Sequence, residues 1–77
     1  MRRNNLDVTV DILEVARGGA NKTKIVYKAN LNFAIVKNYL STLTSGGLLG
    51  IDDNGEFFTT SEGVKFVNGV EEKRIAA

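Results

Sequence analysis

Apolar residues recur with a helical period over residues 6–17, near the start of the chain. Seven apolar side chains fall in this stretch, and the acidic ones lie between them, which predicts a helix with one buried face. Asn4 or Asn5 is expected to cap its first turn by accepting a free backbone N–H. We expect Gly18-Gly19 to end it, because glycine adopts the left-handed conformation beyond a helix without steric cost.

A second, shorter apolar stripe predicts a helix over residues 22–29. Asn21 or Thr23 is its expected N-cap, and Asn30 is expected to take the left-handed position at its C-terminal end. Leu31 stands alone between two asparagines and is expected to be a buried turn residue.

The third predicted helix, residues 32–45, has the clearest amphipathic pattern in the chain, with Asn32 as its N-cap and Gly46-Gly47 as its end. The stripe expected to face the core comprises Phe33, Val36, Leu40 and Leu43, with Tyr39 beside it. The opposite face is small, polar and free of acidic residues, and comprises Ala34, Ile35, Lys37, Asn38, Ser41 and Thr42.

A β-hairpin is expected over residues 48–59, followed by a fourth helix over residues 61–72. Asn54-Gly55 between apolar runs is a strong hairpin signal when both turn residues take positive φ. Phe57 and Phe58 are adjacent, so one is expected to pack in the core and the other to lie exposed. Thr59 and Glu62 have the spacing of a capping box, and Thr60 is an equally good N-cap. The predicted fold is therefore mainly α with a small antiparallel hairpin, in one domain spanning residues 1–77.

The turn between the second and third predicted helices is short enough to indicate a helix-turn-helix. In that motif the second helix enters the major groove of DNA, and its N-terminal residues meet base edges. The residues expected to contact bases are Asn32, Ala34, Ile35, Asn38 and Ser41. Those expected to contact phosphates are Lys22, Lys24, Lys28, Lys37, Arg2 and Arg3. Each lysine can also be interpreted as an ordinary solvated surface charge. Asn38 can likewise be interpreted as an ordinary exposed polar residue.

Charge is unevenly distributed along the chain, although the net charge is only +1. No acidic residue occurs from Val15 to Ile51, whereas five basic residues lie there. Such a segment is suited to binding a polyanion. The charge distribution by itself is explained equally well by a solvated basic face that has no partner. The expected hairpin tip, Asp52 to Glu56, is acidic and would be repelled by phosphate. Calcium binding at this tip is not expected, because the ligand spacing of a calcium loop is missing.

Composition argues against catalysis and against metal or cofactor binding. The chain has no cysteine and no histidine, so it lacks thiolate ligands, the commonest metal ligand and the usual general base. No nucleophile–base pair or phosphate loop has recognisable spacing. No apolar run approaches the roughly 20 residues that span a bilayer. The expectation is a protein without enzymatic activity, cofactor, metal or membrane partner, in the cytoplasm and associated with the nucleoid.

Residues 23–33 read TKIVYKANLNF, and residues 36–40 read VKNYL. These segments resemble TRIMYKANLSY and LKKYL in small archaeal winged-helix DNA-binding regulators. Residues 45–49 (SGGLL) are similar to their KGLI, residues 59–63 (TTSEG) to their TTEKG, and residues 10–14 (VDILE) to a first helix that reads DIL. The resemblance implies a winged-helix fold, DNA binding by the third helix, and often dimerisation through a C-terminal helix.

The chain also departs from that family. Phe33-Ala34-Ile35 stands where relatives carry a lysine-rich helix, and the segment after residue 61 is too short for a long dimerising coiled coil. A homodimer through the first or last helix remains open. The alternative function is a protein-interaction module for docking or dimerisation, which binds DNA weakly or not at all. The acidic tip and Ile35 favour this alternative.

Overall fold

The computed structural model describes the backbone of residues 4–76 and the side chains of residues 4–72, so that Arg2 and Arg3 lie outside it. In chain order its elements are α1 (Asn5–Val15), the 3₁₀ turn η1 (Ala16–Gly18), α2 (Lys22–Ala29), α3 (Phe33–Ser45), β1 (Leu49–Ile51), β2 (Phe57–Thr59) and α4 (Ser61–Ala76). This order confirms the predicted fold class. The fourth helix is longer than predicted, and the first begins one residue earlier.

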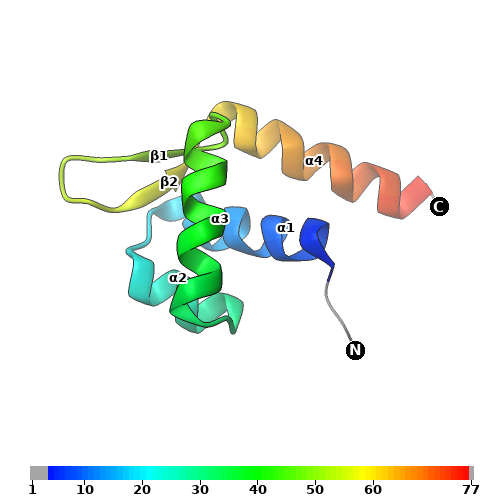
Figure 1. The fold of residues 1–77 in the computed structure, drawn as a ribbon. Helices are drawn as coiled ribbons and strands as arrows, with labels where there is room; N and C mark the ends of the chain where they lie inside the picture. Colours follow the sequence, from blue (N-terminus) through cyan, green and yellow to red (C-terminus); the bar gives the residue numbers. More distant parts are fainter. Residues whose placement is uncertain (1–3, 77) are drawn as a thin grey trace.

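The core lies where α1 meets the other elements. Figure 1 shows α3 crossing in front of α1, with α2 below α1 and α4 above it. The hairpin projects to the left. Ile12 and Leu13 of α1, Ile25 of α2 and Val36 of α3 have no exposed surface. Among the side chains that the structure describes, the buried core comprises Val8, Val10, Ile12, Leu13, Ala16, Ala20, Ile25, Ala29, Val36, Leu40, Leu43, Leu49 and Val67.

Side-chain caps set the beginning of α1, and glycine sets the end of its 3₁₀ continuation. The Asn4 Oδ1 accepts a hydrogen bond from the Asp7 N–H at 2.8 Å, and the Asn4 N–H donates to Asp7 Oδ2 at 3.4 Å. The final turn tightens into the 3₁₀ turn η1 (Ala16–Gly18), and Gly19 follows with φ 93°. Glycine tolerates this positive φ, as predicted for the helix end.

The hairpin is a short antiparallel pair that a third segment extends by one bridge. Leu49 pairs with Thr59, Gly50 with Phe58 and Ile51 with Phe57. Ala20 and Phe57 exchange two backbone hydrogen bonds, of 2.9 and 2.8 Å. This bridge ties the residues that precede α2 to β2, and so fixes α2 relative to the hairpin.

The tip of the hairpin differs from the predicted two-residue turn. Gly55 has φ 77°, whereas Asn54 does not have a positive φ. The Gly55 N–H donates to the Asp52 carbonyl at 3.0 Å, and the Asp52 N–H donates to the Glu56 carbonyl at 2.9 Å. The Asp52 Oδ1 also accepts from the N–H groups of Asn54 and Glu56, both at 2.9 Å. The aspartate therefore stabilises a longer loop, in which only the glycine needs a left-handed conformation.

Thr60, rather than Thr59, caps α4. The Thr60 hydroxyl accepts from the Gly63 N–H at 3.1 Å and donates to the Gly47 carbonyl at 2.6 Å. The Thr59 hydroxyl instead donates to the Leu13 carbonyl of α1 at 2.6 Å. The predicted Thr59–Glu62 capping box was therefore wrong, because Thr59 is the last residue of β2 and its side chain turns to α1.

Candidate nucleic-acid interface

A three-residue turn, Asn30 to Asn32, sets the angle between α2 and α3. Asn30 is left-handed, with φ 57° and ψ 51°, as predicted. The Asn30 N–H donates to the Tyr27 carbonyl and the Leu31 N–H to the Val26 carbonyl, at 3.3 and 3.1 Å. These are the two bonds of a Schellman motif, and the apolar side chains of Val26 and Leu31 pack against the core beside them.

Asn32 then begins α3 as its N-cap. The Asn32 Oδ1 accepts from the Ile35 N–H at 2.8 Å, as the sequence predicted. The helix therefore uses one lone pair of the amide oxygen, and the second lone pair and the two N–H donors of the amide nitrogen are left for a ligand.

The face of α3 that points away from the core is exposed and uncharged except for one lysine. Val36, Leu40 and Leu43 are buried in the core, and α3 packs against α2 and β1. The exposed residues on the other sides of the helix include Ala34, Ile35, Lys37, Asn38, Ser41 and Thr42. These side chains stay exposed within the described part of the chain, and Figure 1 shows α3 at the front of the molecule.

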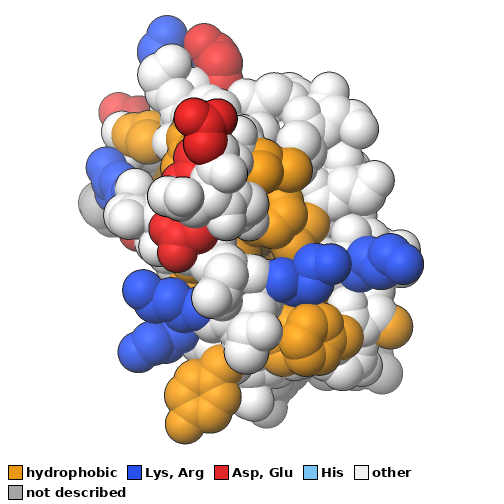
Figure 2. Space-filling model, turned by 90° about the vertical axis from the view of Figure 1, so that its left-hand side faces the viewer, with side chains coloured by type: hydrophobic (Ala, Val, Ile, Leu, Met, Phe, Trp, Pro, Cys, Tyr) orange, Lys and Arg blue, Asp and Glu red, His pale blue; other side chains and the backbone are white. Residues whose placement is uncertain are grey.

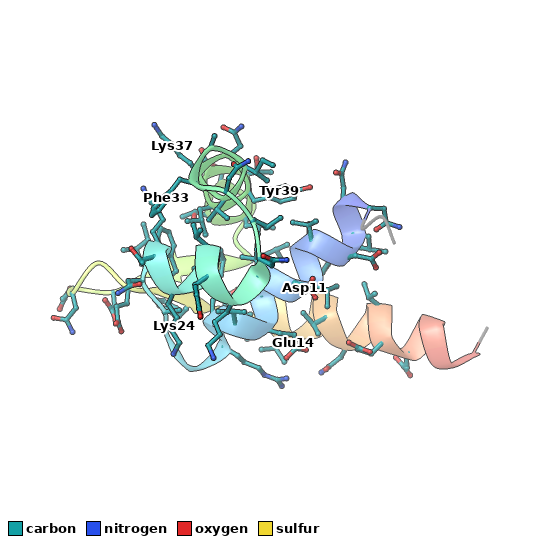
Figure 3. The ribbon with its side chains drawn as sticks, turned by 90° about the horizontal axis from the view of Figure 1, so that it is seen from below. Asp11, Glu14, Lys24, Phe33, Lys37 and Tyr39 are labelled. Atoms are coloured by element: carbon teal, nitrogen blue, oxygen red, sulfur yellow. The ribbon has the colours of Figure 1, made fainter. Side chains whose placement is uncertain are left out.

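Phe33 does not belong to the core, and this prediction was wrong. Its side chain is 53% exposed, whereas Val36, one turn further along the same stripe, is fully buried. The apolar stripe of α3 is longer by one turn than the surface that covers it. Figure 3 shows Phe33 and Lys37 together on one side of α3, with Tyr39 on the other side.

A groove of about 310 Å³ follows α3 on the side of the hairpin. Lys22 of α2 and Lys37 of α3 both line it, so the fold brings together two of the predicted phosphate-contacting residues. The remaining lining residues are Leu40, Ser41, Thr44, Ser45, Ile51 and Phe57. Within this groove the described residues carry positive charge only.

The other predicted basic residues are placed differently. Figure 3 shows Lys24 on the side of α2 that points away from α3, opposite to Lys37. Lys28 is exposed in the last turn of α2. Lys22 and Lys37 are thus the pair that shares one surface with the outward flank of α3.

A second groove, of about 400 Å³, lies on the other side of α3, against the start of α1. Asn38 lines it together with Tyr39, whose hydroxyl donates to Asn5 Oδ1 at 2.8 Å. Ile35, 41% exposed, precedes Asn38 by three residues and therefore shares this side of the helix. Among the predicted base-contacting residues, Ala34 and Ser41 thus lie nearer the lysine pair than Ile35 does.

The hairpin carries the negative charge of this end of the molecule. In Figure 2 most acidic side chains lie over the projecting hairpin and above it, while the lower part of the same face carries basic side chains and exposed apolar ones. Asp52 and Asp53 are exposed, as is Ile51 at 54%. Phe57 packs against the core and Phe58 is 40% exposed, which confirms the expected division between the two rings.

The described residues form no group of three or more acidic, cysteine or histidine side chains that could hold a metal ion. None of their helices combines the length and apolar character needed to cross a membrane.

Comparison with known families decides what this arrangement is. The family model described as winged helix-turn-helix matches residues 2–76. The chain is a winged helix-turn-helix protein. The hairpin is accordingly its wing, and α3 occupies the position of the second helix of the motif.

A solved structure agrees in fold. Sso10a-2, described as a DNA-binding protein from Sulfolobus solfataricus, superposes with a TM-score of 0.84 at 22% sequence identity. The match covers 96% of this winged helix-turn-helix chain and 81% of the other. No curated protein matches the chain in sequence.

Proposed function

We propose that this winged helix-turn-helix protein binds double-stranded DNA without catalysis, with α3 in the major groove, and that it acts as a transcription regulator of the archaeal type. The observation that carries the proposal is the acid-free flank of α3, exposed beside a groove that Lys22 and Lys37 line. A helix is about 10–12 Å wide with its side chains, and the major groove of B-DNA is about 12 Å wide.

This surface makes two kinds of contact with DNA, to phosphates and to base edges. Lys22 and Lys37 neutralise phosphates on the wing side of α3, which fixes the register of the protein on the duplex. The side chains directed to base edges are Asn32, Ala34, Ile35, Asn38 and Ser41. Lys24, Lys28, Arg2 and Arg3 add positive potential and reach phosphates further along the duplex.

The family and the solved neighbour support this proposal. Winged helix-turn-helix domains use the second helix of the motif to read DNA, and Sso10a-2 is described as DNA-binding. A duplex-binding protein of this kind acts at the nucleoid, and we place it there.

The acidic wing favours a second candidate, a docking or dimerisation module. Asp52 and Asp53 would be repelled by phosphate, and Ile51 beside them is 54% exposed. In that case the wing contacts a protein, which includes a second copy of this chain, and duplex binding is weak or absent. Sedimentation at rising protein concentration distinguishes the two, because a docking module that pairs with itself gains mass without DNA.

Duplex titration by fluorescence anisotropy at several salt concentrations tests the main proposal. Affinity is expected to fall with salt, with a log–log slope of about −0.9 per phosphate neutralised. Lys37→Glu is expected to weaken binding to every duplex and to lower the magnitude of that slope by about 1 or more. Lys65→Glu is the matched control, because Lys65 lies on α4 and its ammonium is paired with Glu62 at 3.7 Å. Equal binding by the two variants would refute the assignment of α3, and no duplex binding by the wild type would refute the function.

A further inference from the structure

Phe33 is an exposed aromatic residue at the N-terminal end of α3. It is the first residue of the helix, follows the Asn32 cap, and leaves 53% of its surface in water. The N-terminal residues of the second helix of a helix-turn-helix are those that approach base edges. Phe33 therefore has both the position and the exposure expected of a residue that contacts DNA.

The segment of the chain that carries the ring is positively charged. Lys37 lies four residues further along α3 and on the same side, and it lines the groove together with Lys22. No acidic residue occurs between Val15 and Ile51. With Lys37 on a phosphate, the phenyl ring is one turn nearer the N-terminus on the same side of α3, at the end of the helix that approaches the bases.

A phenyl ring restricts what Phe33 can recognise. It has no hydrogen-bond donor or acceptor, so it cannot read the polar pattern of the groove. Each base pair shows a distinct pattern in the major groove, and its apolar feature is the C5 methyl group of thymine. Contact with that methyl removes apolar surface of both partners from water, which favours binding.

We infer that Phe33 is a specificity-determining residue that packs against thymine methyl groups, so that the protein prefers A·T-rich duplexes through this contact. The inference rests on the proposed duplex binding. It assigns to Phe33 a role that the helical pattern, which places it in the core stripe, does not indicate. It also separates Phe33 from Ala34 and Ile35, the other apolar side chains at this end of α3.

Replacement of thymidine by deoxyuridine tests the contact, because it removes the methyl group and leaves the base pairing and its donors and acceptors in place. Fluorescence anisotropy compares an A·T-rich duplex with its deoxyuridine counterpart, for the wild type and for Phe33→Ala. Tyr27→Ala is the matched control, since Tyr27 is 82% exposed but lies on α2. Circular dichroism verifies that each variant is folded.

The wild type is expected to bind the deoxyuridine duplex about fourfold more weakly for each methyl group contacted. Phe33→Ala is expected to bind both duplexes equally, at the affinity of the wild type for the deoxyuridine duplex, and Tyr27→Ala is expected to keep the full difference. Equal binding of both duplexes by the wild type would overturn the inference and leave the proposed function intact. A thymine preference that persists in Phe33→Ala would assign the methyl contact to another residue. Absence of wild-type binding to either duplex would overturn the proposed function as well.

Discussion

Replacement of Gly63 by alanine tests the contact that holds α4 against the wing. Gly63 is buried in the first turn of α4, and a Cβ atom there would lie 2.3 Å from the Leu48 carbonyl oxygen and 2.6 Å from Thr59 Cγ2. The Leu48 carbonyl cannot yield easily, because it accepts the Thr60 N–H at 3.0 Å. Gly69 is the matched control on the same helix, since a Cβ there would meet no atom within 4 Å.

The magnitudes follow from these two environments. Alanine gains about 1 kcal/mol over glycine within a helix, so Gly69→Ala is expected to raise the free energy of unfolding by up to that amount. At Gly63 the same gain is opposed by an overpacking cost of about 1–3 kcal/mol and by loss of a backbone hydrogen bond of about 1 kcal/mol. The expected net change for Gly63→Ala is a loss of about 1–3 kcal/mol.

Thermal unfolding followed by circular dichroism measures the difference. A change of 1 kcal/mol shifts the Tm of a domain this size by about 4–8 °C, so the two variants should differ by roughly 10–30 °C, with Gly63→Ala the less stable. If both substitutions raised the Tm equally, the close approach of α4 to the wing would be disproved.

Two further substitutions separate charge from stability on the DNA-binding surface. Asn32→Asp keeps the capping oxygen and suits the positive end of the helix dipole, so the Tm is expected to hold or rise. Its charge would lie near phosphate, so duplex affinity should fall about fourfold by anisotropy at low salt, and a fall in Tm would contradict the capping role. Asp53→Asn removes a wing charge and should tighten binding about twofold if that charge lies about 10 Å from a phosphate. This gain in affinity should shrink as salt is added, and the control Glu71→Gln on α4 should show no gain. Equal gains from Asp53→Asn and Glu71→Gln would mean that only the net charge of the protein matters.

Local chemistry made the helix ends predictable from sequence. The caps Asn21, Asn30 and Asn32 act on groups within a few residues of themselves, so their roles depend little on the rest of the fold. The two bounds of α2 and the turn that follows it were therefore accessible from the residues alone. The outward flank of α3 was also predictable from the sequence, because its polar residues recur with the helical period.

Features that depend on distant partners were not predictable. Periodicity places Phe33 in the core stripe but cannot show that the covering surface ends one turn before it. The choice between Thr59 and Thr60 as cap depends on the Leu13 carbonyl of α1, which is 46 residues away from Thr59 in the chain. The pairing of Lys22 with Lys37 across one groove likewise requires the bridge between the segment before α2 and the wing.

The most direct test of how this protein meets DNA is an NMR titration of the ¹⁵N-labelled chain with a short duplex. Amide shifts are expected to change most at the start and outward flank of α3, at Ala34, Lys37 and Ser41, and at Lys22 beside it. The amides of α4 (Ser61–Ala76) should stay nearly unchanged. Largest changes on α4, with α3 unaffected, would contradict the account.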